Sequence, residues 1–395
     1  MNKDLNLEKI KEFHKNYINN KDNLEIETNI KNNGIKNAII DTTRLNEFSY
    51  KFNIEIPEVK IYNQKNSYQC NIYAFLRVIK STMNKKYRNI DLSANYIEFY
   101  DKLEKVNSLY NSLLNEEELT LEIINQKVNR YIGIYGTFHF CREIVNKYGL
   151  VPNNIMKEAS NNYNAVELIE LLRAKIKTDA LCLLNKSYTE KSSLKDTLIQ
   201  EAYTFLAKVM THPPIQFKYK NKTYTPIDFK NKILKTDLSE FITITPFNKK
   251  DFLNSNDFIP NVYLKNNEEI HKLSIEKIKD AVLAQLKDGI AIWFSSEEST
   301  TLDYNINILD ENLYQYEKLL GIKNINKNKE LLLDLINYDH AMTITGALLK
   351  NNEIKQFKVD NSFGYHGKYK GYLIMSTDFF ENKVITFIIN KKYLN

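Results

Sequence analysis

Three residues that lie far apart in this chain have the types that a thiol-based nucleophilic site needs. They are Cys70 in the segment NQKNSYQC, His340 in DHAMTITG and Asn361 in KVDNSFG. A cysteine, a histidine and an asparagine in this order can form a thiolate–imidazolium pair whose imidazole is oriented by the amide. Gln64 lies six residues before Cys70 and can donate a side-chain N–H to an oxyanion beside the Cys70 backbone N–H.

The cysteine is expected at the start of a helix, because apolar residues follow it at helical spacing. These residues are Ile72, Phe75, Leu76, Ile79 and Met83. Ser67 or Asn66 is expected to cap this helix, which places Cys70 in its first turn. There the helix dipole and a neighbouring imidazolium both favour thiolate over thiol. The sequence therefore predicts a cysteine peptidase.

Each of these residues also has a purely structural explanation. A free cysteine is usually a small core residue, a histidine before an apolar strand can satisfy a backbone carbonyl, and asparagine is common in turns. The combination of Cys70 with Gln64 and the downstream pair favours catalysis. Cys141 and Cys182 lie in helical patterns and are predicted to be packing residues.

No metal or other cofactor is expected. Neither HExxH nor CxxC occurs. The histidines without metal-ligand spacing are His139, His212, His271 and His366.

The composition is that of a globular protein, with 43% hydrophobic and 26% charged residues in a chain of 395. The formal charge of +6 comes from 55 basic and 49 acidic residues that are spread along the chain. Short patches such as NKNK occur without any block of five like charges. A solvated surface therefore explains the charge better than the competing hypothesis of nucleic-acid binding.

The sequence indicates a cytoplasmic protein that does not contact a membrane. Three cysteines do not describe a disulfide framework and fit a reducing compartment. The amino-terminal segment MNKDLNLEKIKEFHKNYINN is charged throughout and has no apolar core of a signal peptide. No run approaches the roughly 20 apolar residues that span a bilayer.

Five segments, in this order, resemble the papain superfamily and within it the bleomycin hydrolase and aminopeptidase C branch. NQKNSYQCNIYAFLRVIK resembles the segment around the nucleophile, and DLSANYIEFYDKLEK resembles the helix that follows it. YGTFHFCREIVNKYGLVPNN is similar to the segment that lines the non-prime substrate cleft. THPPIQFKY with YTPIDFKNKIL resembles the inserted helical region, and the match from KDGIAIWF to NKKYL is nearly continuous.

The resemblance implies an α+β, papain-like fold of two lobes, one helical and one β-barrel-like, with a helical insertion. It implies hydrolysis of small peptides through a thioacyl-enzyme. Cys70 would be the nucleophile, His340 would relay the proton, and Asn361 would orient the imidazole. It also implies a homo-oligomer, a hexamer in the branch.

Four segments are expected along the chain. Residues 1–50 form an N-terminal arm, 51–160 the helical lobe with the nucleophile, 161–285 the insertion and 286–395 the β-rich lobe. The 270 positions between Cys70 and His340 exceed the roughly 130–150 of plain papain-like enzymes, and the insertion accounts for the excess. Helices are expected at about Phe138–Tyr148 and Ile275–Lys287, and strands at Ile290–Phe294 and in AMTITGALL, IKQFKVDNS, GYLIMS and KVITFIIN.

The chain departs from the branch around the cleft. Tyr68 replaces a glycine two residues before the nucleophile, Asn71 replaces the tryptophan that follows it, and Phe363 replaces a tryptophan that shields the asparagine–histidine hydrogen bond. The glycine pair whose backbone receives the substrate reads Tyr135-Gly136. These five residues are therefore predicted to line the substrate site. An alternative is a degenerate, catalytically weak or inactive relative that acts in binding or assembly.

A last expectation concerns the carboxyl end. Aminopeptidases of the branch extend beyond the NKKYL strand with a tail whose terminal carboxylate receives the amine of the substrate. Because this sequence stops at Asn395, oligopeptidase or endopeptidase action is the alternative to aminopeptidase action.

Overall fold

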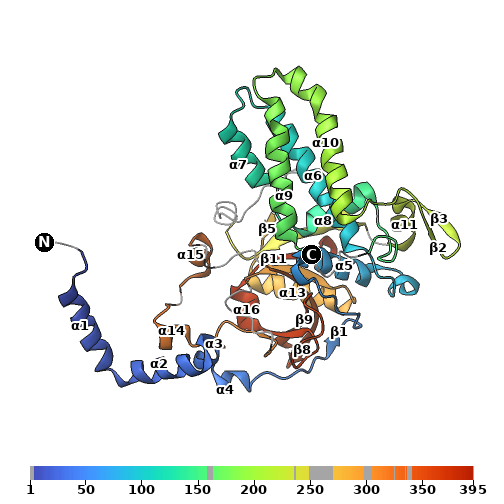
Figure 1. Ribbon diagram of the computed structural model, residues 1–395. Helices are drawn as coiled ribbons and strands as arrows, with labels where there is room; N and C mark the ends of the chain where they lie inside the picture. Colours follow the sequence, from blue (N-terminus) through green and yellow to red (C-terminus); the bar gives the residue numbers. More distant parts are fainter. Residues whose placement is uncertain are drawn as a thin grey trace.

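The computed structural model describes residues 4–157, 163–234, 237–248, 270–297, 305–323, 325–333, 335 and 340–394. Within these ranges one large sheet is surrounded by helices, and a group of long helices stands apart from it (Figure 1). The expected α+β class is confirmed. Asn395, on which the expectation about the carboxyl end depends, lies outside the described residues.

The helices are α1 (Leu7–Ile18), α2 (Lys21–Asn33), α3 (Ile35–Ile39), α4 (Thr42–Leu45), α5 (Cys70–Thr82), α6 (Ala94–Leu114), α7 (Leu121–Tyr131), α8 (Phe138–Tyr148), α9 (Ala165–Asp179), α10 (Tyr188–Met210), α11 (Pro226–Ile233), α13 (Ile275–Lys287), α14 (Tyr316–Leu320), α15 (Lys327–Leu332) and α16 (Thr377–Asn382). The strands are β1 (Ile54–Glu55), β2 (Phe217–Tyr219), β3 (Lys222–Tyr224), β4 (Phe241–Thr245), β5 (Ile270–Lys272), β6 (Ile292–Ser296), β7 (Ile308–Leu309), β8 (His340–Lys350), β9 (Glu353–Asp360), β10 (Tyr372–Ser376) and β11 (Val384–Asn390).

The N-terminal helices extend away from the rest of the molecule (Figure 1). Asn6 caps α1 by accepting a hydrogen bond from the Lys9 backbone N–H at 3.0 Å. Neither α1 nor α2 buries a side chain. The apolar side chains of α1 are therefore exposed, and they include Leu7, Ile10 and Phe13.

Helix α5 lies at the centre of the molecule. Every side chain from Asn71 to Thr82 is buried. The Trp293 indole on β6 donates to the Asn71 carbonyl at 3.2 Å, and the Thr343 hydroxyl on β8 donates to the Ala74 carbonyl at 3.4 Å. The helix that begins at Cys70 thus packs against the strand that begins at His340.

The large sheet has the strand order β5-β4-β11-β6-β8-β9-β10-β7, and β1 pairs with β8. Strand β8 is antiparallel to β1, β6 and β9; Ser296 on β6 lies opposite His340, and Val359 on β9 lies opposite Ile344. All residues of β11 are buried, because helices cover the sheet there. This burial explains why KVITFIIN is nearly uniformly apolar.

The stretch assigned to a helical insertion contains more than helices. Helices α9 and α10 pack beside α6 and α7, at the top of the view (Figure 1). Strands β4 and β5, at the end of the same stretch, join the large sheet beside β11. In the part of the chain that the structure describes, no helix is both long and apolar enough to cross a lipid bilayer.

Candidate active site

Cys70 is the first residue of α5, as expected, but the predicted caps were wrong. The N-cap is Gln69, whose backbone carbonyl accepts from the Ile72 and Tyr73 N–H groups, both at 3.0 Å. Asn66 and Ser67 instead belong to a 3₁₀ turn that ends before Tyr68. Within the described residues no side chain caps this helix end. The positive end of the helix dipole therefore lies at the partly exposed Cys70 thiol.

His340 and Asn361 are brought together, and a backbone group identifies which atom of the Asn361 amide faces the imidazole. His340 Nε2 lies 2.8 Å from Asn361 Oδ1, and the Ser362 backbone N–H donates to the same oxygen at 2.7 Å. Because a backbone N–H can only donate, this atom of the amide is the oxygen. Nε2 of His340 must therefore carry a proton, which leaves Nδ1 of a neutral ring without one.

Ser362 also orients Gln64, a role that the sequence analysis missed. Its hydroxyl donates to Gln64 Oε1 at 3.0 Å, and its carbonyl accepts from the Gln64 backbone N–H at 2.7 Å. Since Oε1 is the acceptor, the Nε2 amide group of Gln64 is directed to the other side, where it is available as a donor. The only sequence signal for Ser362 is its place directly after Asn361.

Phe363 covers the imidazole. Its ring stacks on His340 with centroids 5.2 Å apart and an interplanar angle of 20°. Asn361 is 4% exposed, and its Nδ2 has no hydrogen-bond partner among the described residues. The His340–Asn361 hydrogen bond is therefore shielded from water although Phe363 stands in place of the tryptophan of the branch.

Tyr68 has a left-handed backbone, with φ 53° and ψ 34°. Residues other than glycine rarely adopt this region, which explains why a glycine is favourable at the position. The Tyr68 side chain is 48% exposed. It is thus accessible to a substrate near Cys70, at some cost in backbone strain.

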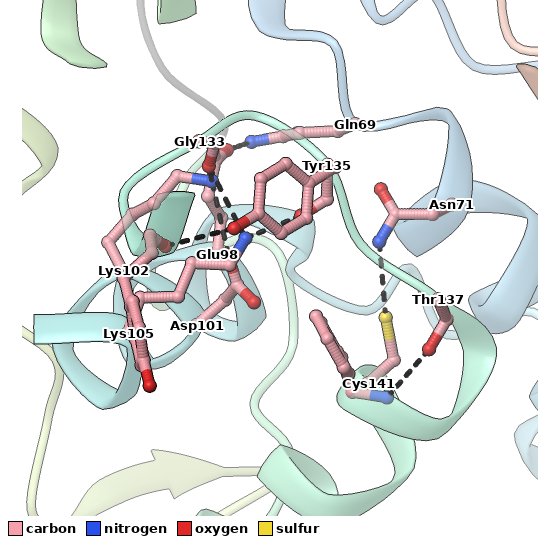
Figure 2. Close-up of polar contacts among 12 residues, drawn as sticks. Gln69, Asn71, Glu98, Asp101, Lys102, Lys105, Gly133, Tyr135, Thr137 and Cys141 are labelled. Atoms are coloured by element: carbon pink, nitrogen blue, oxygen red, sulfur yellow. Dashed lines mark hydrogen bonds and ion pairs between the residues drawn. The ribbon is translucent and has the colours of Figure 1, made fainter. Parts of the chain in front are cut away.

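Asn71 and Gly136 touch. The Asn71 side chain is buried and its Nδ2 donates to Cys141 Sγ at 3.7 Å (Figure 2). A Cβ atom on Gly136 would lie 2.4 Å from this Nδ2. A side chain at position 136 would have to displace the Asn71 amide, so the backbone of Gly136 lies next to the first turn of α5.

Tyr135 folds back over its own loop. Its hydroxyl donates to the carbonyls of Arg130 and of Tyr131, the latter at 3.2 Å. A Cβ on Gly133 would strike the Tyr135 ring. Burial raises the pKa of Tyr135, so the phenol stays neutral at physiological pH. The ring packs inside the loop, which leaves the backbone of this segment as the part that can meet a substrate.

A buried cluster of four charged residues on α6 supports this region, and the sequence analysis did not predict it. Its members are Glu98, Asp101, Lys102 and Lys105. Glu98 accepts a hydrogen bond from the Gln69 side chain, next to the nucleophile (Figure 2). Burial raises the pKa of Glu98, whereas Lys105 and Lys102 hold the pKa of Asp101 low against the effect of its burial. The helical i, i+4 spacing of Asp101 and Lys105 was the available signal.

The other cysteines differ from each other. Cys141 is buried, as predicted, and burial raises the pKa of its thiol well above the usual range. Cys182 is exposed, so its prediction as a packing residue was wrong. It belongs to the 3₁₀ turn Ala180–Leu183, of which Ala180 and Leu183 are the buried residues.

The described residues contain no group of three or more histidine, cysteine, aspartate or glutamate side chains that could hold a metal ion.

The chain is similar to a known protein family and to several known peptidases. The model of the Peptidase C1-like family matches residues 4–395. The chain is 29% identical to aminopeptidase E of Lactobacillus helveticus, covering 99% of this chain and 94% of that protein. It is 28% identical to aminopeptidase C of Listeria monocytogenes, over 100% of this chain and 94% of the relative. Bleomycin hydrolase of Gallus gallus is 26% identical over 85% of this chain and 80% of its own length.

A solved structure shares the fold. The crystal structure of PepW from Lactobacillus rhamnosis superimposes with a TM-score of 0.86 at 24% sequence identity, covering 100% of this chain and 94% of that one.

Proposed function

The chain belongs to the Peptidase C1-like family and is a cysteine peptidase; we propose that Cys70, His340 and Asn361 form its catalytic triad and that it removes residues from the amino ends of small peptides. The observation that carries the triad is the 2.8 Å contact between His340 Nε2 and Asn361 Oδ1. It supports a neutral imidazole with Nδ1 as the proton acceptor.

In the proposed reaction the Cys70 thiolate attacks the scissile carbonyl carbon. The proton from Cys70 resides on His340 Nδ1 and passes to the leaving amine as the C–N bond breaks and the thioacyl-enzyme forms. A water molecule, deprotonated by the same nitrogen, then releases the acid. The Nε2 group of Gln64 and the Cys70 backbone N–H donate to the oxyanion in both steps.

Aminopeptidase action is supported by the names of the relatives, which include aminopeptidases C and E. The test uses purified protein under reducing conditions with an aminoacyl fluorogenic substrate and its acetylated twin. We expect a preference for the free amine of a hundredfold or more in kcat/KM, which corresponds to roughly 2.7 kcal/mol of transition-state binding. Equal cleavage of both would establish the oligopeptidase or endopeptidase alternative.

The degenerate alternative is tested in the same experiment. Cys70→Ala protein serves as the control for contaminating peptidases. No turnover above this control, for any substrate, would mean that the chain is an inactive relative.

We propose further that the protein is a homo-oligomer, a hexamer as the resemblance implies, in which a second copy covers α1. The exposed apolar residues Leu7, Ile10 and Phe13 lie on one face of α1 and support this. Light scattering of Phe13→Asp protein should show smaller particles than wild type. Glu12→Lys changes a residue on the opposite face and should not.

We also propose that the protein is cytoplasmic. It is supported by the three cysteines, which are all free thiols, as is usual in a reducing compartment. Fractionation of the source cells with an antibody to the protein tests it directly.

A further inference from the structure

Lys105 lies in the middle of α6 and is 0% exposed. Its Nζ pairs with Asp101 Oδ2 at 2.9 Å and donates to the carbonyls of Gly133, at 3.3 Å, and of Tyr135 (Figure 2). The Tyr135 ring covers the ammonium, with its centroid 4.5 Å from Nζ. The ammonium thus holds the loop that leads to Gly136 from its buried side.

This contact determines where the next N–H points. The Tyr135 carbonyl and the Gly136 N–H belong to one planar trans peptide unit, so they point in opposite directions. Because the carbonyl points inward to Lys105, the Gly136 N–H points away from the cluster. Gly136 also touches Asn71, the residue after Cys70. The outward N–H is therefore presented beside the nucleophile.

We propose that Lys105 is a positioning residue for substrate binding, which holds the Tyr135 carbonyl so that the Gly136 N–H meets the main chain of a bound peptide. The inference rests on the proposed function and deepens it, since it assigns the buried group that positions the loop of Tyr135 and Gly136. Lys105 acts through the backbone and does not touch the substrate.

A neighbouring lysine provides a matched control. Lys102 is equally buried, pairs with Asp101 at 3.1 Å and donates to the Gly133 carbonyl at 3.3 Å. Its ammonium lies 3.6 Å from Glu98, and its contacts do not include the Tyr135 carbonyl. Lys105→Met and Lys102→Met each remove one buried cation from the same cluster, but only the first frees the Tyr135 carbonyl.

The first measurement is peptide affinity without turnover. Both lysine variants are made in Cys70→Ala protein, and titration calorimetry measures the binding of an alanyl tripeptide amide with a free amino end. We expect Lys105→Met to weaken binding about tenfold and Lys102→Met to leave it within twofold. Circular dichroism and urea unfolding verify that both variants fold.

The second measurement separates binding from nucleophile reactivity. In protein that retains Cys70, Lys105→Met should raise KM about tenfold, with kcat and the rate of Cys70 alkylation by iodoacetamide unchanged within twofold. A purely structural role would slow alkylation as well, because iodoacetamide is too small to need the groove.

Three results would overturn the proposal. They are unchanged peptide affinity in Lys105→Met, equal losses in both lysine variants, and a fall in alkylation that matches the fall in kcat/KM. Absence of peptide binding in the Cys70→Ala parent would also overturn it. If the wild type bound peptide but hydrolysed none, the proposed function would fail while the calorimetric comparison still decided the role of Lys105.

Should Lys105→Met not fold, Lys105→Gln takes its place. Its amide is neutral and its side chain is one atom shorter than that of lysine, so the charged donor to the Tyr135 carbonyl is lost in this variant too. The same loss of affinity is expected, and its absence would contradict the proposal.

Discussion

Arg77 and Asp360 form a buried ion pair, with 2.6 Å between Arg77 Nε and Asp360 Oδ2 and side-chain exposures of 7% and 6%. Arg77 lies on α5, two turns after Cys70, and Asp360 directly precedes Asn361. The Thr345 hydroxyl donates to the other carboxylate oxygen at 2.5 Å. This pair ties the helix that begins at Cys70 to the end of β9, directly before Asn361.

Breaking this ion pair should be costly. Arg77→Leu leaves the Asp360 carboxylate buried without its cation, and we expect the free energy of unfolding in urea to fall by about 3–5 kcal/mol. The exposed pair between Lys355 and Glu353, at 2.5 Å, is the control. Lys355→Ala should cost less than about 1 kcal/mol. Equal effects of the two changes would contradict this view of the core.

Thiol labelling should single out Cys70. We expect an epoxide-type thiol inhibitor to modify Cys70 at least about 100-fold faster than the other cysteines, because Cys70 is the first residue of α5 and is proposed to pair with His340, whereas Cys141 is buried and its thiol pKa is raised. Cys182 is the informative comparison, since it is exposed but its pKa is raised by partial burial and by Asp179. Peptide mass spectrometry after a short exposure measures all three sites. Faster labelling of Cys182 would show that exposure alone governs reactivity.

The two partners of the thiol should contribute unequally. His340→Ala removes the base and should lower kcat by about 10²–10⁴-fold. Asn361→Ala keeps the base but loses its orientation, and a fall of about tenfold is expected. Fluorogenic assays at saturating substrate measure both. Near wild-type kcat in His340→Ala would refute the triad.

Gln64 and Ser362 should act on the same step. Gln64→Ala removes one oxyanion donor and should lower kcat by about 10²–10³-fold with little change in KM. Ser362→Ala keeps the Gln64 donor but removes the hydroxyl that orients the Gln64 amide, so a smaller fall in kcat is expected.

Ser67→Ala is the control for these two variants. The Ser67 hydroxyl is buried near Gln64 but has no hydrogen-bond partner among the described residues. Its removal should leave kcat unchanged. If Ser362→Ala behaved like Ser67→Ala, the orientation of Gln64 would not depend on the serine hydroxyl.

Regular periodicity made the long elements predictable. Helices α8 and α13 have the expected bounds, because Gly149 and Gly289 follow their last turns. Strand β6 starts at Ile292 rather than Ile290, because the side chains of Ser81 and Gln285 hydrogen-bond the backbone of Ala291 before the ladder begins. The contact of Ser81 with Ala291 joins residues 210 positions apart in sequence, and no local pattern predicts it.

The sequence likewise predicted some residues of the site and not others. The residue types of Cys70, His340 and Asn361 were readable, since their chemistry is unusual in combination. The role of Ser362 and the one proposed for Lys105 were not, because the groups that they contact, the Gln64 amide and the Tyr135 carbonyl, are brought near them only by the fold. The misassigned cap has the same cause: the left-handed Tyr68 separates Ser67 from the helix.

Alkaline pH should stabilise the fold through Lys105. Burial lowers the pKa of Lys105 to about 8, whereas lysine in the unfolded chain titrates near 10.4. Between these values the unfolded state binds more protons, so the free energy of unfolding rises with pH. The buried Cys141 acts with the opposite sign, because its pKa is raised in the folded state.

The difference in the free energy of unfolding between wild type and Lys105→Met isolates the contribution of the lysine. In urea unfolding this difference should shift by about 1 kcal/mol in favour of the wild type from pH 8 to pH 9.5. A difference that stayed constant over this range would mean that Lys105 keeps an ordinary pKa in the folded protein.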